Sequence, residues 1–302
     1  MNRYKSSLFA VGFALVTLLS ANAALAQQET TAEERERRVQ AMLAAPNPLQ
    51  ASDSLWIEEL TYMEVRDRIA AGDTTAIIPT GGIEENGPYL ATGKHNVILR
   101  ALCPAVAKAL GKALCAPIVP FVPEGDLDPP SGAMMFPGSF TVRDETYIAL
   151  LEDIGNSLKL HGFKDIVLIG DSGGNQRGMA LAAEILNRQW RGTGTRAHFV
   201  IEFYTPGWEA TEKYTAEELG VSEGKNDGFH DDIWVTAMMM VTDPDSVRYI
   251  ERIAADRASI NGVDISDLGR TIDLGKKMIA FRAEYSAKAI RKAIDVDRAG
   301  TK

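Results

Sequence analysis

Positive charge is scarce in this sequence of 302 residues. It has 32 Lys and Arg against 41 Asp and Glu, which gives a formal net charge of −9 at pH 7. A chain of this charge repels polyanions, so we expect neither nucleic acid nor an anionic membrane surface as a partner. Internal repeats and low-complexity tracts are also missing. With 45% hydrophobic and 24% charged residues, the chain can bury the core of one large domain.

Cysteine is nearly absent, and its spacing matches no zinc site. Cys103 falls in a helical pattern over residues 97–110, and Cys115 begins an apolar strand. We therefore interpret both as small core residues, although an oxidising compartment would also permit a disulfide between them. Histidine is almost as scarce, and the sequence has four: His95, His161, His198 and His230.

Two of the four histidines have a structural interpretation. His161 ends a helical pattern before a glycine and is expected to cap that helix. His198 begins a predicted strand, where a structural role is expected. His95 and His230 therefore remain as candidates for chemistry, and two aspartates directly follow His230.

Long apolar runs are missing apart from one near the N-terminus. There Leu8–Leu19 follows two basic residues, and Ala24-Leu25-Ala26 offers the small residues that a signal peptidase reads. The run is much shorter than the ~20 residues of a membrane span, so we interpret residues 1–26 as a secretory signal peptide. Its removal leaves a periplasmic or secreted chain that begins at Gln27. A polar extension over residues 27–54 then precedes the folded domain.

From residue 55 on, strand-like and helix-like runs alternate. Strands are expected at 75–79, 114–122, 165–169 and 197–204, and helices at 60–71, 97–110, 144–160, 178–189, 247–260 and 274–294. This alternation predicts an α/β fold with a mainly parallel sheet flanked by helices. We assign 55–260 to the catalytic domain and 261–302 to a C-terminal helical extension. Within the domain, 208–228 is expected to form a flap and the methionine-rich run 236–241 to pack in the core.

Polar side chains follow two of the predicted strands. They are Glu84, Glu85, Asn86 and His95 after the first strand, and Asp171, Ser172 and Asn175 after the third. Parallel strands end at the same edge of a sheet, so we expect the two junctions to meet in one pocket. A buried carboxylate beside a histidine needs a compensating cation, commonly a divalent metal. Glu84 and Asp171 also suit a plainer role as caps of the helices that follow.

The order of these motifs resembles the creatininase (creatinine amidohydrolase) family. Its members carry Gly-Ser-x-Glu-Gln-His-Gly-Pro-His-Leu-Pro-Leu-x-x-Asp after the first strand, where this chain has Gly81-Gly-Ile-Glu84-Glu-Asn86-Gly-Pro-Tyr-Leu-Ala-Thr-Gly-Lys-His95. Phe136-Pro-Gly-Ser139 is similar to the family's Phe-Pro-Gly-Thr, and His161-Gly-Phe163 to its His-Gly-Phe. Gly170-Asp-Ser172-Gly-Gly-Asn175 takes the place of Asn-x-His-Gly-Gly-Asn. These matches extend over residues 75–247 in the family's order.

The resemblance implies a metal-dependent hydrolase of a carbon–nitrogen bond in a small amide or cyclic amide. Three of the four matching ligand positions are substituted, because Asn86, His95 and Ser172 stand where the family has His, Asp and His. Only Glu84 is kept. We therefore expect one divalent ion (zinc, manganese or iron) rather than two. The expected ligands are Glu84, His95, Asp171 and His230.

The catalytic roles follow from the same resemblance. His230 is expected to donate a proton to the leaving nitrogen, while Glu84 and Asp171 take part as ligands or bases. The substrate is a small molecule, and its expected contacts are Glu85, Asn86, Ser172, Asn175 and Trp208. A homo-oligomer is implied, with hexamers usual in the family. Two alternatives stay open: a metal-free hydrolase or lyase on the same scaffold, and an exported binding protein without catalysis.

Overall fold

A computed structural model describes residues 32–299 of the chain, with side chains up to residue 296. The predicted signal peptide lies outside the described residues. The chain divides into two units, residues 1–51 and 52–302. The first contains helix α2 (Ala32–Ala44), which lies in the expected polar extension and buries none of its residues. Among the described residues, no helix is long and apolar enough to cross a membrane.

The second unit is built on a sheet of four parallel strands. Its order is β2 (Ala113–Cys115), β1 (Thr75–Thr80), β3 (Asp165–Gly170) and β4 (Arg196–Phe199). The predicted α/β fold with a mainly parallel sheet is therefore confirmed. The helices are α3 (Tyr62–Ala70), α4 (Lys94–Leu110), α5 (Asp144–Leu160), α6 (Asn175–Gln189), α7 (Thr205–Glu217), α8 (Ile233–Thr242), α9 (Tyr249–Ala254) and α10 (Leu268–Ala299). A small antiparallel pair, β5 (Ser259–Ile260) and β6 (Val263–Asp264), lies between α9 and α10.

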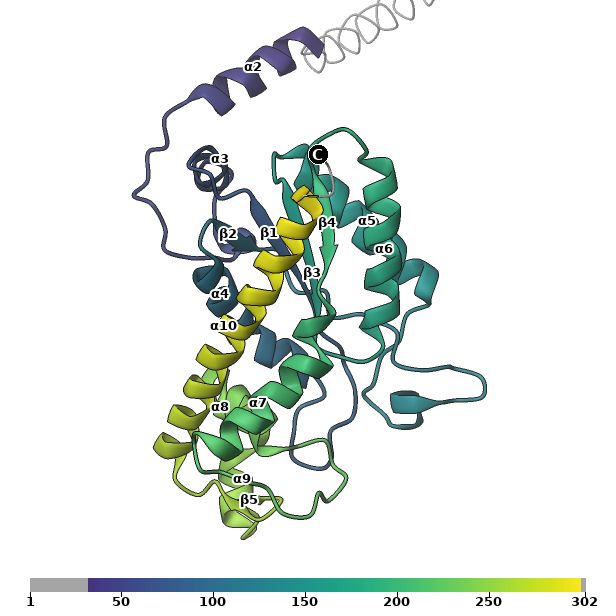
Figure 1. The fold of residues 1–302 in the computed structure, drawn as a ribbon, viewed down its shortest axis with the longest axis vertical. Coiled ribbons are helices and arrows are strands. Elements are labelled where there is room, and N and C mark those ends of the chain that lie inside the picture. Colours follow the sequence, from purple (N-terminus) through teal and green to yellow (C-terminus); the bar gives the residue numbers. More distant parts are fainter. Residues whose placement is uncertain (1–31, 300–302) are drawn as a thin grey trace, which may run out of the picture. The chain divides into compact units, whose positions relative to one another are not determined.

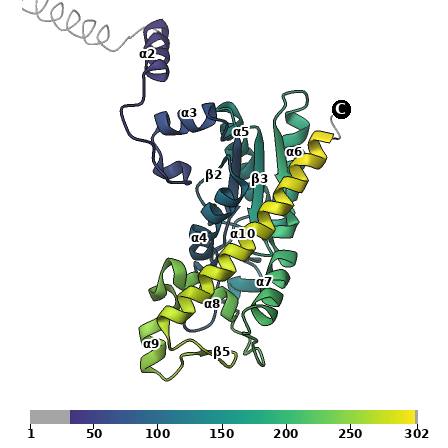
Figure 2. The same cartoon turned by 60° about the vertical axis from the view of Figure 1, so that its left-hand side comes forward.

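Successive side chains of the central strands point to opposite faces of the sheet and fill two cores. Ile77 and Val167 pack with α4, α8 and α10, whereas Ile78 and Leu168 pack with α5 and α6. Both faces are thus covered, which explains why these strands are apolar throughout. Figures 1 and 2 show α5 and α6 on one side of the sheet and α10 crossing the other.

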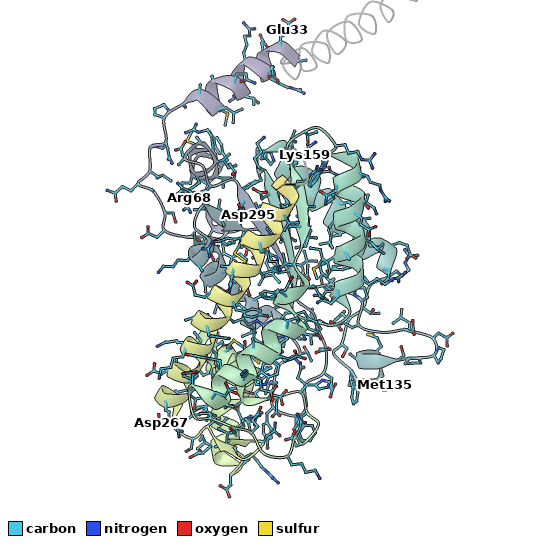
Figure 3. The ribbon with its side chains drawn as sticks, in the orientation of Figure 1. Glu33, Arg68, Met135, Lys159, Asp267 and Asp295 are labelled. Atoms are coloured by element: carbon cyan, nitrogen blue, oxygen red, sulfur yellow. A yellow bond between two sulfur atoms is a disulfide. The ribbon has the colours of Figure 1, made fainter. Side chains whose placement is uncertain are left out.

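Helix α10 is an integral part of the second unit rather than an appended extension. Met278, Ile279 and Ile290 lie in the same core cluster as the strand residue Ile77. In Figure 3, the labels Asp267 and Asp295 lie near the two ends of this helix. The expected boundary at residue 260 therefore does not separate two units, because the apolar stripe of α10 completes one face of the sheet.

Three local expectations also differ from the structure. Strand β2 ends at Cys115 instead of residue 122, since Pro117 and Pro120 lack the N–H groups that extended pairing needs. The expected flap begins as helix α7 and becomes irregular only after residue 217. Cys103 and Cys115 form a disulfide, so the interpretation of two unpaired core residues was wrong. The methionine-rich run, by contrast, is a buried part of α8, as predicted.

The strand order places a crevice at the ends of β1 and β3. From β1 the chain passes through α4 to β2 on one side, and through α5 it then reaches β3 on the other side. Because the two connections leave in opposite directions, a crevice opens beyond the carboxyl ends of β1 and β3. Ligands of open α/β sheets bind in such a crevice.

Candidate active site

Side chains from several segments line one cavity of about 250 Å³ beyond these strand ends. Among them are six of the residues that the sequence predicted: Glu84, His95, Asp171, Ser172, Trp208 and His230. Lys94, Tyr204 and Trp234 line it as well. The two polar junctions therefore meet in one pocket, as the parallel sheet led us to expect.

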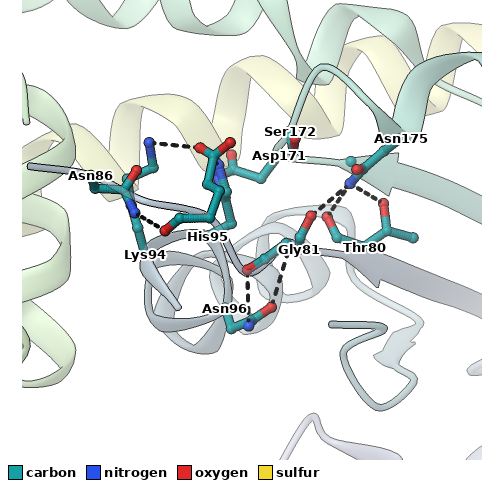
Figure 4. Close-up of polar contacts among 12 residues, drawn as sticks. Thr80, Gly81, Asn86, Lys94, His95, Asn96, Asp171, Ser172 and Asn175 are labelled. Atoms are coloured by element: carbon teal, nitrogen blue, oxygen red, sulfur yellow. Dashed lines mark hydrogen bonds and ion pairs between the residues drawn. The ribbon is translucent and has the colours of Figure 1, made fainter. Parts of the chain in front are cut away.

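His95 is the centre of the polar cluster. It lies in the first turn of α4 rather than on the preceding loop, because that helix begins at Lys94. Its Nδ1 is 2.8 Å from Oδ2 of Asp171, and its Nε2 is 2.8 Å from Oε1 of Glu84. Figure 4 shows this group beside the strand ends. Carboxylates at both ring nitrogens suit an imidazolium, in which both nitrogens donate.

Each of these two carboxylates also contacts a second cation. Nζ of Lys94 is 3.2 Å from Oε1 of Glu84, and the Lys94 side chain is only 6% exposed. A guanidinium nitrogen of Arg282 is 3.4 Å from Oδ1 of Asp171, and both side chains are fully buried. The same nitrogen donates to the carbonyl oxygen of Phe203 at 2.7 Å. Protein cations therefore compensate both carboxylates, the buried Asp171 and the half-buried Glu84.

The electrostatics of the cluster favour charged side chains. Burial opposes ionisation of Glu84, but the hydrogen bond and charge of His95, together with Lys94, lower its pKa to about 2. Burial and the Lys94 charge oppose protonation of His95, yet its hydrogen bonds to Asp171 and Glu84 outweigh them and raise its pKa. Burial lowers the pKa of Arg282 to about 9, so this side chain also stays cationic at neutral pH.

Beside this cluster lies a second pair, Ser172 and Glu124. The hydroxyl of Ser172 donates to Oε2 of Glu124 at 3.2 Å, and Oε1 of Glu124 has no hydrogen-bond partner within the described part of the chain. Two glycines allow the segment around Glu124 to approach this closely. A Cβ on Gly174 would lie 1.8 Å from the carbonyl oxygen of Pro123, and a Cβ on Gly82 would lie 2.3 Å from Oε1 of Glu124. The backbone before Glu124 can therefore pack closely against the turn that carries Ser172.

Glu124 titrates differently from the other carboxylates of the site. It is 9% exposed, and burial together with the charge of Glu84 raises its pKa to about 7. Unlike Glu84 and Asp171, it has no Lys or Arg ion pair among the described residues. A carboxylate with a pKa near 7 can accept and return protons at neutral pH.

Aromatic side chains form another wall of the cavity. The rings of Trp208 and Trp234 lie with their centroids 4.2 Å apart, and the guanidinium carbon of Arg282 lies 3.1 Å from the centroid of the Trp208 ring. Tyr204 completes the wall. Burial and the nearby carboxylates raise the pKa of Tyr204, so its hydroxyl remains a proton donor at neutral pH.

Three of the predicted substrate contacts do not line this cavity. Asn86 donates to the carbonyl oxygen two residues before it at 2.8 Å, and Asn175 donates to the carbonyl oxygens of Thr80 and Gly81, each at 2.9 Å. Glu85 is positioned through its backbone amide, which donates to a serine hydroxyl at 3.1 Å. Figure 4 shows the asparagine contacts at the end of β1. These residues hold the loops in place.

Sequence reasoning missed Lys94, Glu124, Tyr204 and Arg282. For Glu124 a signal was present, since it follows the apolar run 114–122 in the same way that Glu84 follows β1. Lys94 directly precedes the predicted residue His95. For Arg282 no local signal exists, because it comes from α10 and lies 111 residues beyond Asp171.

Comparison with known proteins points to one family. The family model "Creatininase: Creatinine amidohydrolase" matches residues 58–284. The chain belongs to the creatininase family. A creatinine amidohydrolase from Pseudomonas putida is 24% identical over 202 residues, which are 65% of this chain and 75% of that protein. A crystal structure of a creatininase has a TM-score of 0.60 at 22% identity, covering 80% of this chain and 98% of the other.

Two other creatininase structures are described by the metals they contain. One is named for manganese and the other for a zinc–zinc type, with TM-scores of 0.58 and 0.56, both at 22% identity. Each covers 80% of this chain and 98% of its own. In this member of the creatininase family, however, no three His, Cys, Asp or Glu side chains among residues 32–296 are grouped so that they could hold a metal ion.

The chemistry of the donors explains why the expected ligand set does not fit a metal ion. Both nitrogens of His95 already contact carboxylates, and Lys94 lies on Glu84 where a cation would bind. Arg282 compensates Asp171 in the same way. His230 lines the cavity but is exposed to solvent. A divalent ion would enter a cluster that already holds three cations against two paired carboxylates, and their repulsion opposes its binding.

Proposed function

We propose that this chain is an exported hydrolase that cleaves a carbon–nitrogen bond of a small amide or cyclic amide without a metal ion in its cavity. The observation that carries this proposal is the pairing of Lys94 with Glu84 and of Arg282 with Asp171 around His95. These side chains provide fixed positive charge where a metal would otherwise compensate the carboxylates. Preorganised charge of this kind stabilises the negative oxygen that develops when an amide carbonyl is attacked.

The remaining groups supply the other requirements of amide hydrolysis. Tyr204 offers a hydroxyl donor on the cavity wall, and Glu124 offers a carboxylate that can move a proton near neutral pH. The tryptophan wall and the volume of about 250 Å³ suit a small planar molecule. His230 lies on the solvent side, where we assign it to contact with the substrate rather than to the essential proton transfer.

The disulfide between Cys103 and Cys115 supports the proposed export, because disulfides persist in oxidising compartments such as the periplasm. N-terminal sequencing of protein from the native cell envelope tests this part, with Gln27 as the expected first residue. We also propose a homo-oligomer, for which light scattering of the purified chain is the test.

Chelation is the decisive experiment for the proposed activity. Purified protein is dialysed against a strong chelator, analysed for metals and assayed with creatinine and a panel of lactams and hydantoins. We expect turnover of at least one of these amides to be unchanged at a metal content far below one ion per chain. Loss of activity on chelation, with recovery after manganese or zinc is added, would overturn the metal-free proposal. Absence of turnover in both forms would favour a binding protein.

A further inference from the structure

We propose that Ser172 is a nucleophile that forms an ester with the acyl group of the substrate, and that Glu124 accepts its proton. This inference deepens the proposed function and rests on it, since it names the group that attacks the amide in the absence of a metal-bound water. It also gives a role to the hydroxyl at a position where the resemblance implies a metal-binding histidine.

The position of Ser172 is the first support. It stands in the short turn between β3 and α6, at the carboxyl end of a central strand, and it lines the cavity. Figure 4 shows it next to Asp171 at this turn. Ligands of open α/β sheets bind beyond the carboxyl ends of the strands, and the backbone amides at the start of the following helix favour negative charge nearby.

The contact with Glu124 is the second support. A serine hydroxyl is a weak nucleophile until an adjacent base takes its proton. Here Oγ of Ser172 already donates to Oε2 of Glu124 at 3.2 Å, which is the geometry that such a transfer needs. The base is itself anchored, because the backbone amide of Glu124 donates to Thr141 at 3.0 Å and its carbonyl oxygen accepts from Ala133 at 3.1 Å.

Tyr204 is the third support, as a donor for the oxygen of the attacked carbonyl. Its hydroxyl would lie 3.1 Å from a Cβ built on Gly173, the residue directly after the nucleophile. A side chain at position 173 would therefore crowd this hydroxyl, and glycine leaves the space between them open. The nucleophile and its base are thus in contact, and the hydroxyl donor lies beside the glycine that follows the nucleophile.

The reaction needs only water besides the substrate and these side chains. As Oγ of Ser172 bonds to the carbonyl carbon, its proton passes to Glu124 and the carbonyl electron pair moves to oxygen, where Tyr204 donates a hydrogen bond. Collapse of this intermediate breaks the carbon–nitrogen bond, and the nitrogen takes the proton from Glu124. Water then attacks the ester, gives a proton to Glu124 and releases the acid, and the proton returns to Ser172.

Covalent labelling tests the proposal on the chelated full-length protein. The probes are p-nitrophenyl acetate and a fluorophosphonate, and the adduct is located by intact-mass and peptide mass spectrometry. We expect one adduct per chain on Ser172, none in Ser172→Ala, and labelling slowed by about 10²–10⁴-fold in Glu124→Gln. Ser286→Ala is the matched control, since Ser286 is another buried serine but lies on α10 and does not line the cavity. It should label like the wild type.

The outcomes separate this inference from the proposed function. No adduct with either probe on the wild type, or an adduct on a different residue, overturns the nucleophile. So does full amide turnover in Ser172→Ala, even though the metal-free hydrolase would then stand. Labelling of Ser172 with no amide hydrolysed would instead retain the nucleophile and refute the carbon–nitrogen hydrolase.

Discussion

Replacing the buried carboxylate Glu124 by its amide is expected to stabilise the protein in alkaline solution. Burial and the Glu84 charge raise the pKa of Glu124 from 4.5 to about 7. The folded protein therefore holds a proton on this side chain that the unfolded chain releases. Its contribution to stability is fully present below about pH 4.5 and is lost as the pH rises through about 7. Glu124→Gln removes this titration and remains neutral at every pH.

The size of the effect follows from the difference in pKa. At about 1.4 kcal/mol per pKa unit, ionised Glu124 costs the folded state up to about 3 kcal/mol. The side chain is only 9% exposed, so solvent screens little of this cost. We expect Glu124→Gln to exceed the wild type by about 1–3 kcal/mol at pH 8 and by less than about 1 kcal/mol at pH 5. Such a gain raises Tm by about 2–4 °C per kcal/mol in a domain of this size.

Urea denaturation at pH 5 and pH 8 measures this difference. The other titrating groups are common to wild type and variant, so their contributions cancel when the two free energies of unfolding are subtracted. Glu184→Gln on α6 is the control, because Glu184 is exposed and its replacement should change stability by less than about 0.5 kcal/mol at either pH. A variant that is no more stable than the wild type at pH 8 would refute the high pKa and with it the proton-transfer role of Glu124.

Three further predictions concern the cations, the disulfide and the cavity rim. Lys94→Met should lower the free energy of unfolding by about 3 kcal/mol and should bind manganese in equilibrium dialysis, whereas the exposed control Lys108→Met should do neither. Equal manganese uptake by the wild type would contradict this role of Lys94. Cys103→Ala with Cys115→Ala should cost about 3 kcal/mol in urea denaturation, because the disulfide closes a short loop; an unchanged midpoint would be evidence against that bond. His230→Asn is chosen because asparagine tolerates the left-handed backbone at φ 52°. If His230 only contacts the substrate, KM should rise while kcat falls less than tenfold; a loss of about 10²–10⁴-fold in kcat would restore His230 as general acid.

Much of the fold could be predicted because the central strands are apolar on both faces. A central strand is one of the few ways in which residues 75–79 and 165–169 can bury their apolar side chains. The structure contains both strands, each with one more residue than predicted. The prediction failed where backbone chemistry mattered more than hydrophobicity. At 114–122 the apolar run is genuine and largely buried, yet its two prolines stop the ladder after three residues.

The part of the site that directly follows the strands was the easiest to predict. Glu84, His95 and Asp171 were found because strand ends are where such sheets place ligand contacts. The residue type does not reveal that a particular Lys or Arg is buried, because these residues are usually exposed. Arg282 reads as one more basic residue of an amphipathic helix, and only the packing of α10 on the sheet reveals that its guanidinium meets Asp171.

The substitutions at the family's ligand positions form one consistent change in charge. The resemblance implies an aspartate at position 95 and a metal ion beside Glu84. In this chain His95 replaces the acid with a base, and Lys94 places an ammonium on the same carboxylate oxygen. One protonated imidazole and one ammonium carry the charge of a divalent ion, so Glu84 and Asp171 remain compensated while the ligands themselves are lost. This exchange does not replace a metal-bound water. Ser172 instead offers a hydroxyl that lines the cavity and contacts the base Glu124.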